Sequence, residues 1–271
     1  MRRLLPALVL LLAGCAGAEP TRVAESERPT IVSLNPCTDA VLAEVTVPGQ
    51  LLAISHYSKD PRSSSMDART AARFAATGGT VEEVLALDPD LVVAGSFLAP
   101  ATRAALEDFG VEVATFDIAR DVASSEAQVR DLAALAGDPE AGEALVAQIE
   151  HALSEAAPAT GEPVEILLWQ PGGIVAGEQE LVSDLLRRTG FANVAPRRGL
   201  GQADYVALED VVATPPRVLL VAGGEVGQRH PVLDRLPQMR REAFDTSLLY
   251  CGGPTIIRAA ERLAEIRENA S

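Results

Sequence analysis

Histidine, cysteine and aromatic residues are all scarce in this chain of 271 residues. It has 3 histidines and 3 cysteines, and aromatic residues make up 4% of the sequence. His56, His151 and His230 lie far apart, and no His-x-x-x-His, Glu-x-x-His or Cys-x-x-Cys spacing occurs, so nothing indicates a zinc site. The Gly-x-Ser-x-Gly and P-loop motifs are also missing. We therefore expect no catalytic residues, no metal ligands and no cofactor, and a hydrolytic enzyme is the less favoured alternative.

Positive charge is limited as well. The chain has 23 lysine and arginine residues against 38 acidic residues, which gives a formal charge of −15, and Lys59 is its only lysine. Such an acidic surface repels nucleic acid and anionic lipids, because both carry negative charge. We therefore expect no nucleic-acid partner and no direct binding of the folded body to a membrane surface.

A long apolar segment occurs only at the beginning of the sequence. Arg2 and Arg3 precede the apolar run 4–12, and small residues follow it, which is the arrangement of a secretory signal. The run is far shorter than the ~20 residues that cross a bilayer. We therefore predict a signal peptide over 1–14 and an extracytoplasmic mature protein. Its charge changes from −15 to −17, because two arginines and no acidic residue leave with the signal.

The residues around Cys15 also predict a lipid anchor. The tetrad LAGC that ends at Cys15 resembles a bacterial lipobox, in which the cysteine is lipidated and becomes the first mature residue. Cleavage after Ala18 is the alternative, because the residues before it fit the small-x-small pattern. The following residues are small, polar and charged, so 15–28 would form a lipidated tether to a folded body that begins near Pro29.

Two cysteines remain in the folded body, Cys37 and Cys251. Cysteines can pair in an oxidising compartment, but a disulfide also requires Cα atoms within about 7 Å, which a sequence does not reveal. We favour two unpaired thiols over a disulfide.

Short apolar runs rich in β-branched residues alternate with helical patterns, which is typical of parallel sheets covered by helices. The predicted fold class is therefore α/β, with Rossmann-like units. The expected strands lie at 31–34, 51–54, 91–94, 111–116, 164–169, 217–221 and 247–250, and a closing helix lies at 254–267.

The alternation stops between 122 and 153, where apolar residues recur at helical spacing. Gly137 can end one helix there, and Asp138 followed by Pro139 can begin the next. The predicted organisation is an N-terminal α/β lobe over 29–120, connecting helices over 121–157 and a C-terminal α/β lobe over 158–271.

An internal repeat supports this division into two lobes. In 82–95 and again in 209–223, a glutamate opens a short helix, a proline follows seven residues later, and a buried strand comes next. Equivalent units in two lobes suggest pseudo-symmetry, with a ligand held in a cleft between strand ends that face each other.

Three segments carry a resemblance to a known family: IVSLNP at 31–36, SHYSKDP at 55–61 and TVEEVLALDPDLV at 80–92. From about Pro29 onwards the chain resembles the class III periplasmic substrate-binding proteins of ABC importers for vitamin B12, ferric siderophores and haem. The resemblance implies two α/β lobes joined by one long helix, and a cleft that captures a metal chelate without chemistry.

The resemblance also implies where the permease binds. In that family one glutamate on each lobe docks against arginines of the membrane permease, and the matching positions here are Glu82 and Glu209. Two carboxylates on rigid helix starts would orient the protein on two symmetric permease subunits. The alternative is a solvated glutamate favoured by the helix dipole. The shared seven-residue offset to a proline favours docking.

Loops that follow the strands are the natural lining of such a cleft, and a chelate is held by apolar and aromatic faces with a few polar or cationic groups. Tyr57 matches a tyrosine of the family's vitamin B12 site. Trp169 either offers a stacking face or fills the core, and Arg62 either meets an anionic ligand or pairs with Asp60. Cobalamin-binding members carry further tryptophans that this chain lacks, which leaves room for a siderophore or another corrinoid. The predicted ligand-binding residues are Asn35, Pro36, Cys37, Tyr57, Arg62, Phe97, Trp169, Gln170 and Tyr250.

These features predict an extracytoplasmic solute-binding lipoprotein. It would capture a ferric siderophore, a cobalamin-type corrinoid or haem and deliver it to an ABC permease with its ATPase. We expect a monomer that touches the membrane only through its lipid. An envelope lipoprotein that uses the same fold as a scaffold is the alternative.

Overall fold

The computed structural model describes residues 28–270. The predicted signal peptide, Cys15 and nearly all of the predicted tether lie outside the described residues. Within 28–270 no helix has the length and apolar character needed to cross a membrane.

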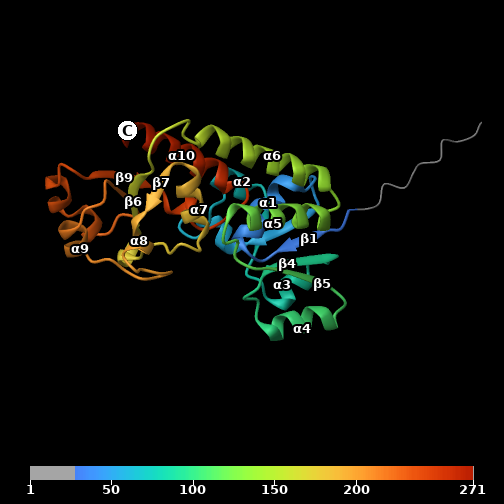
Figure 1. The fold of residues 1–271 in the computed structure, drawn as a ribbon. Helices are drawn as coiled ribbons and strands as arrows, with labels where there is room; N and C mark the ends of the chain where they lie inside the picture. The colour runs from blue at the N-terminus through green and yellow to red at the C-terminus, as the bar shows by residue number, and fades with distance from the viewer. Residues whose placement is uncertain (1–27, 271) are drawn as a thin grey trace, which may run out of the picture.

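The first lobe is built on a parallel five-stranded sheet in the order β3-β2-β1-β4-β5 (Figure 1). The central strands are buried because their Val, Ile and Leu side chains are covered on both faces. The strands of this lobe are β1 (Ile31–Ser33), β2 (Leu51–Ser55), β3 (Ala75–Thr77), β4 (Leu91–Gly95) and β5 (Glu112–Phe116). Its helices are α1 (Pro36–Val45), α2 (Ala68–Ala72), α3 (Val81–Leu85) and α4 (Pro100–Asp108).

The second lobe has a parallel four-stranded sheet in the order β7-β6-β8-β9. Its strands are β6 (Val164–Trp169), β7 (Phe191–Asn193), β8 (Val218–Ala222) and β9 (Arg240–Phe244). Its helices are α7 (Leu181–Arg188), α8 (Val194–Arg197), α9 (Leu208–Ala213) and α10 (Thr255–Ala270). Short 3-10 helices lie at His56–Lys59, Pro171–Gly173, Gly227–Arg229, Pro231–Arg235 and Thr246–Leu248. The two sheets confirm the predicted α/β class with two lobes.

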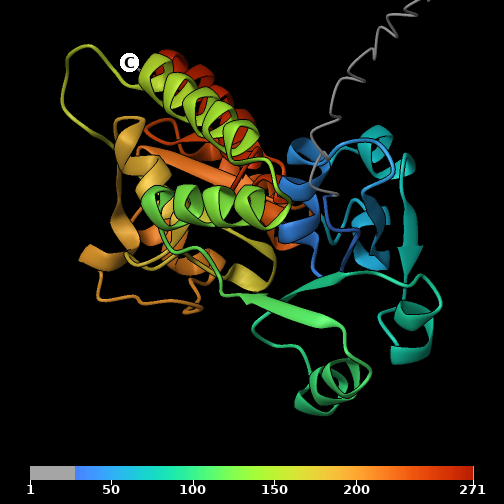
Figure 2. The ribbon, with the colours of Figure 1, turned by 90° about the vertical axis from the view of Figure 1, so that its right-hand side faces the viewer.

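The connector consists of two helices, α5 (Val122–Leu135) and α6 (Pro139–Ala156), instead of the one long helix that the resemblance implied. Gly137 ends the first helix with φ +74°, and the Asp138 side chain caps the second by accepting from the Ala141 N–H at 3.1 Å. The helices pack closely because Gly142 has no side chain, and a Cβ there would lie 2.5 Å from the Cβ of Ala133. Figure 2 shows α6 alongside α10, with α5 crossing between the lobes.

One apolar cluster runs through both lobes. It joins Ile31 of β1, Leu132 of α5, Ile149 of α6, Ile166 of β6 and Leu263 of α10, all fully buried. Because the lobes share this core, a large rigid-body separation would expose much apolar surface, at roughly 25 cal/mol per Å². The shared core therefore favours small relative movements of the lobes.

The strand predictions are confirmed at six of the seven positions, and 247–250 is wrong, because a 3-10 turn lies there. The sequence also gave no sign of β3, β7 and β9. All three are edge strands, paired on one side only. An edge strand needs fewer buried β-branched residues, so sequences such as RREAF at Arg240–Phe244 do not carry the apolar pattern of a central strand.

Candidate functional site

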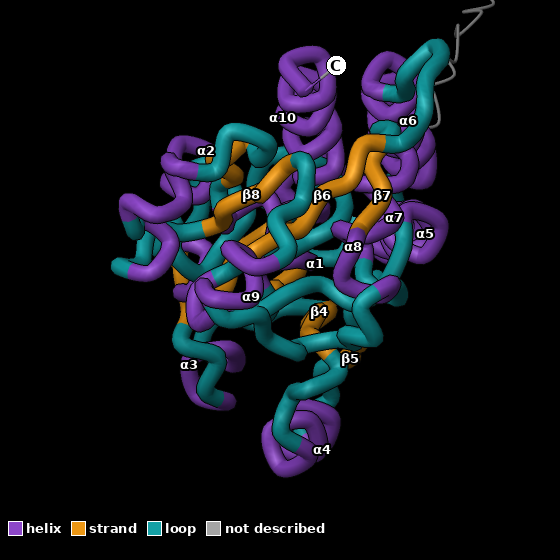
Figure 3. The backbone as a smooth tube through the Cα atoms, turned by 60° about the vertical axis from the view of Figure 1, so that its left-hand side comes forward, coloured by secondary structure: helices purple, strands orange, loops and turns teal. Residues whose placement is uncertain are grey.

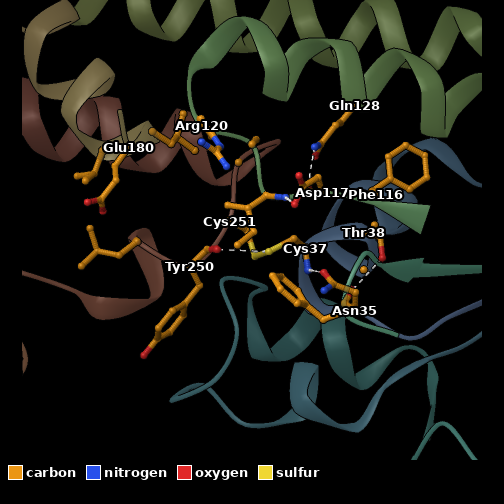
Figure 4. A pocket seen from close by; sticks show the side chains of 18 of the residues that line it. Asn35, Cys37, Thr38, Phe116, Asp117, Arg120, Gln128, Glu180, Tyr250 and Cys251 are labelled. Atoms are coloured by element: carbon orange, nitrogen blue, oxygen red, sulfur yellow. Dashed lines mark hydrogen bonds between the residues drawn. A yellow bond between two sulfur atoms is a disulfide. The ribbon is translucent and has the colours of Figure 1, made fainter. Parts of the chain in front are cut away.

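A cavity of about 410 Å³ lies between the lobes (Figure 4). The first lobe lines it with the loops that follow β1, β4 and β5, and the second lobe with residues 179–182, Gln202 and residues 249–252. In parallel sheets the loops after the carboxyl ends of neighbouring strands meet at one edge, which is where such folds bind ligands. The cavity therefore lies where the topology places a ligand site.

A disulfide between Cys37 and Cys251 forms part of the cavity wall, with a Cα–Cα distance of 5.1 Å. The preference for two unpaired thiols is therefore wrong. The residues are 214 positions apart, and they meet only because the loop after β1 and the loop before α10 face each other across the lobe boundary. Figure 4 shows the Cys37–Cys251 disulfide, with the Asn35 side chain on one side of it and the Tyr250 side chain on the other.

Asn35 is held firmly in the wall at the beginning of α1. Its Oδ1 accepts from the Cys37 N–H at 2.8 Å, and Pro36 occupies the first turn of the helix. The Asn35 amide nitrogen lies against Gly95, where a Cβ would come within 2.7 Å of it. Asn35 and Cys37 line the cavity, whereas Pro36 only shapes the helix start.

Much of the lining is apolar. Phe97 and Ile118 are 79% and 62% exposed, which is unusual for side chains of this kind, and both line the cavity. Tyr250 also lines it, and its hydroxyl donates to the Arg62 carbonyl oxygen at 2.8 Å. Phe116, Leu181, Val182 and Leu249 complete the apolar surface.

Two carboxylates also line the cavity, on different sides of it. The Asp117 carboxylate accepts from the Ile118 N–H at 2.8 Å and from the Ser96 hydroxyl at 3.1 Å, and these bonds lower its pKa. Across the cavity, burial raises the pKa of Glu180, whose Oε1 accepts from the Gly177 N–H at 2.6 Å.

Arg120 is the cation that lines this cavity. Among residues 28–270, no hydrogen bond or ion pair occupies its guanidinium group. Sequence reasoning missed Arg120 because it considered the loops after β1, β2 and β4 but not the loop after β5. The same rule, applied to 117–120, would have found it.

Tyr57 and Arg62 lie outside the cavity lining. They follow β2, which is separated from β4 and β5 by β1, so the sheet order carries their loop away from the cavity. The Arg62 side chain is 90% exposed and forms an ion pair with Asp60 at 2.8 Å, which was one of the two alternatives. Lys59 donates to the carbonyl oxygens of α2 and its following residues.

Trp169 and Gln170 are also absent from the lining. The Trp169 ring is 3% exposed and packs with Val175 and Leu219 in the second lobe, and its Nε1–H donates to the Val206 carbonyl oxygen at 2.8 Å. Trp169 therefore fills the core of the second lobe and does not offer a stacking face in the cavity.

The two predicted docking residues occupy equivalent places. Glu82 lies in the first turn of α3 and Glu209 in the first turn of α9, and these helices precede β4 and β8, which pair with β1 and β6 (Figure 3). Both side chains are exposed, and within 28–270 neither forms an ion pair or a side-chain hydrogen bond. By contrast, Glu83 folds back onto the Gly78 N–H at 2.7 Å.

Within the described part of the chain, no group of three or more His, Cys, Asp or Glu side chains is arranged to hold a metal ion.

Comparisons with known proteins agree with this architecture. The family model described as periplasmic binding protein matches residues 31–243. No curated protein sequence gives a significant match.

Several solved structures share the fold. The haem-binding protein RhuT from Roseiflexus sp. RS-1, in its apo form, is 23% identical with a TM-score of 0.68, and the alignment covers 90% of this chain and 98% of that one. The vitamin B12 binding protein BtuF of Vibrio cholerae is 16% identical with a TM-score of 0.66, at 89% and 97% coverage. A possible iron-binding solute-binding protein from Staphylococcus epidermidis is 16% identical with a TM-score of 0.69, at 90% and 99% coverage.

Proposed function

We propose that this chain, which belongs to the family of periplasmic binding proteins, captures a metal chelate outside the cytoplasmic membrane and delivers it to the permease of an ABC importer. The ligand classes we consider are ferric siderophores, cobalamin-type corrinoids and haem. Members of the family bind solutes and hand them on for transport, so no catalytic step is required. The observation that carries the proposal is the cavity between the strand-end loops of the two lobes.

The chemistry of the cavity supports a chelate. A volume of about 410 Å³ lies within the range of roughly 300–1,000 Å³ that is usual for small-molecule sites. Apolar and aromatic side chains such as Phe97 and Phe116 suit the flat organic part of a chelate, and Arg120 suits an anionic substituent. The ligand-contacting residues we propose are therefore Asn35, Phe97, Phe116, Arg120 and Tyr250.

Delivery would use Glu82 and Glu209. Each carboxylate is exposed, lacks a partner within the described residues and lies on a separate lobe. A symmetric permease presents the same basic surface twice, so a pair of equivalent carboxylates would fix the orientation of the docked protein. Lipidation of Cys15 would hold the protein near the membrane, and we propose that it acts as a monomer.

A ligand screen tests the proposal. The purified protein is heated with hemin, cyanocobalamin or each of a panel of ferric siderophores, and its Tm is recorded. A ligand that binds only the folded state adds about 2.7 kcal/mol of stability at a concentration 100 times its Kd, so the correct class raises Tm clearly. If none of the three classes raises Tm, the chelate proposal is wrong and the scaffold alternative gains support.

A further inference from the structure

We infer that the disulfide between Cys37 and Cys251 is a positioning element of the ligand cavity. It fixes one wall of the cavity, so that the width of the cavity changes only at the opposite wall. The fixed position of this wall follows from the contacts of residues 249–253, which we call the pinned segment. The consequence for ligand affinity rests on the proposed function.

The pinned segment belongs to the second lobe and is attached at two points to the first lobe and at one point to the connector helix α5. Cys251 is bonded to Cys37 at the start of α1. The Tyr250 hydroxyl donates to the Arg62 carbonyl oxygen at 2.8 Å, in the loop after β2. The Gly253 N–H donates to Ser125 Oγ at 2.8 Å, in the first turns of α5. Within four residues, one covalent bond and one hydrogen bond thus cross to the first lobe, and a second hydrogen bond ties the segment to the connector.

Two glycines let this segment approach the first lobe closely. A Cβ on Gly252 would lie 2.2 Å from Ser125 Oγ, and a Cβ on Gly253 would lie 2.7 Å from Val41 Cγ2. Gly253 also has φ +57°, a conformation that side chains other than glycine adopt at a cost. The backbone of the pinned segment therefore packs directly against the Val41 side chain of α1 and the Ser125 side chain of α5.

The opposite wall is different. It consists of Gln179, Glu180 and Gln202, also from the second lobe. Leu181 and Val182, which come next in the chain, pack against the shared core, and a Cβ on Gly252 would lie 3.5 Å from Leu181 Cδ2. Among the described residues, no hydrogen bond, ion pair or disulfide joins this wall to residues 28–120. The nearest polar connection is at Asp184, which accepts from the Val122 N–H of α5 at 3.1 Å.

These two walls together determine how the cavity adapts. Asn35, Cys37, Tyr250 and Cys251 keep fixed relative positions because a covalent bond joins their loops. Gln179, Glu180 and Gln202 can move toward or away from Phe97 and the 117–120 loop without breaking a polar or covalent bond between the lobes. A preformed half-site reduces the entropy that binding costs, so the disulfide raises affinity by holding Tyr250 and Asn35 in place.

The first measurement needs no ligand. Hydrogen exchange is followed by mass spectrometry in the oxidised protein and after reduction with a phosphine, with the free thiols counted. We expect amides of residues 250–253 to exchange about tenfold faster or more after reduction, and amides of residues 179–182 to change little. Equal exchange of 250–253 in the two states would overturn the fixed-wall inference, whether or not any chelate binds.

The second measurement uses whichever of hemin, cyanocobalamin or a ferric siderophore raised Tm in the screen. We expect Cys37→Ser/Cys251→Ser to weaken its Kd by about tenfold. Gly252→Ala, which keeps the disulfide but displaces the pinned segment, should weaken it as well, and this variant covers the case in which the serine variant does not fold. Thr80→Ala is the control: it removes a helix cap far from the cavity and should lower Tm while leaving Kd unchanged.

The outcomes distinguish a failure of the proposed function from a failure of the fixed-wall inference. No response to any probe contradicts the proposed function, while the exchange experiment still decides on the fixed wall. A probe that binds with the same Kd to wild type, the serine variant and Gly252→Ala would show that the disulfide has no positioning role.

Discussion

The two lobes contain the same helix–proline–strand unit but secure it differently. In the first lobe the Thr80 side chain caps α3 by accepting from the Glu83 N–H at 3.2 Å, and Glu83 folds back onto Gly78. In the second lobe Ala207 stands at the cap position of α9, where it provides no side-chain bond. The feature that both units retain is an exposed glutamate at the second helical position, which forms no ion pair or side-chain hydrogen bond within residues 28–270. The helix dipole favours a glutamate at this position in any helix, so a role in docking to a partner across both lobes is a proposal that needs its own test.

The lobes also differ in what they bring to the cavity. The first lobe supplies the exposed Phe97 ring, the partly buried Phe116 ring and the cation Arg120. The second lobe supplies Tyr250 and Glu180, while its tryptophan, Trp169, is used in the core. Aromatic and charged lining residues therefore come from both lobes, and the cation comes from the first.

The largest effect should come from the shared glutamates. Glu82→Lys or Glu209→Lys reverses the charge at a proposed docking point, so we expect either variant to abolish ligand uptake in cells, because like charges would then face each other. Ligand Kd, measured on the purified variants, should stay at the wild-type value.

Glu140→Lys is the matched control for this pair. Glu140 is also an exposed glutamate in the first turn of a helix, α6, so the substitution removes the same favourable interaction with the helix dipole. Helix α6 lies on the other side of the molecule from α3 (Figure 1). Normal uptake by Glu82→Lys, or equal loss in all three variants, would contradict docking through Glu82 and Glu209.

A buried acid distinguishes the first lobe in its response to pH. Asp39 of α1 is fully buried, and its Oδ2 accepts from the Ser55 N–H at 2.9 Å and the Ser58 hydroxyl at 2.6 Å, while Oδ1 has no partner. Burial raises the pKa of Asp39 from 3.8 to about 8. Among the described residues, the second lobe buries no carboxylate in this way.

The sign of the effect follows from proton binding. Between pH 3.8 and about 8 the folded protein retains the Asp39 proton that the unfolded chain has lost. The contribution of Asp39 to the free energy of unfolding is therefore complete below pH 3.8 and is lost as the pH rises to about 8. This loss lowers the free energy of unfolding by a few kcal/mol in all. Asp39→Asn keeps a neutral side chain, so its free energy of unfolding should fall less between pH 5 and pH 8 than that of wild type. Urea unfolding at both pH values measures this difference. An equal fall in the free energy of unfolding of the two proteins between pH 5 and pH 8 would contradict the expectation.

The two arginines near the lobe boundary provide the next comparison. Arg120 lines the cavity near the Asp117 carboxylate, and among residues 28–270 its guanidinium group forms no hydrogen bond or ion pair, whereas Arg62 is paired with Asp60 in solvent. Loss of a charge-assisted bond costs about 1.5–3 kcal/mol, so Arg120→Gln should weaken binding of an anionic chelate about 10- to 100-fold. Arg62→Gln should leave Kd within about twofold, because an exposed ion pair contributes little. Titration calorimetry with the chelate from the screen measures both, and the reverse order would move the site to the loop after β2.

The smallest effects concern the helix caps. Thr80→Ala removes the cap of α3 and should lower the free energy of unfolding by about 1 kcal/mol. Ala207→Ser places a cap on α9, where the backbone is already extended, and should raise it by a similar amount. Chemical denaturation of each variant tests the pair. Two changes of the same sign would show that the cap is not the difference between these units.

Sequence reasoning was effective where a feature depends on neighbours along the chain. The central strands, the helices on either side of Gly137 and the repeated units that begin at Glu82 and Glu209 follow from apolar spacing, proline and capping residues. Asn35 and Phe97 line the cavity because the loops after parallel strands gather at one edge, whereas Tyr250 lines it from a segment that follows a 3-10 turn and not the strand expected at 247–250. The edge strand β9 was missed for the opposite reason, since half of its environment is solvent and its sequence is correspondingly polar.

The α/β class, the order of the elements and the duplicated unit follow from the amino-acid sequence, because each of these is specified by residues a few positions apart. Three outcomes depend instead on the folded chain: Cys37 meets Cys251, Arg120 and not Arg62 reaches the cavity, and Trp169 lies in the core. Those outcomes depend on the order of the strands in each sheet and on how one lobe sits against the other. Sheet order and lobe packing arise from contacts between residues as many as 214 positions apart, and no local pattern encodes them.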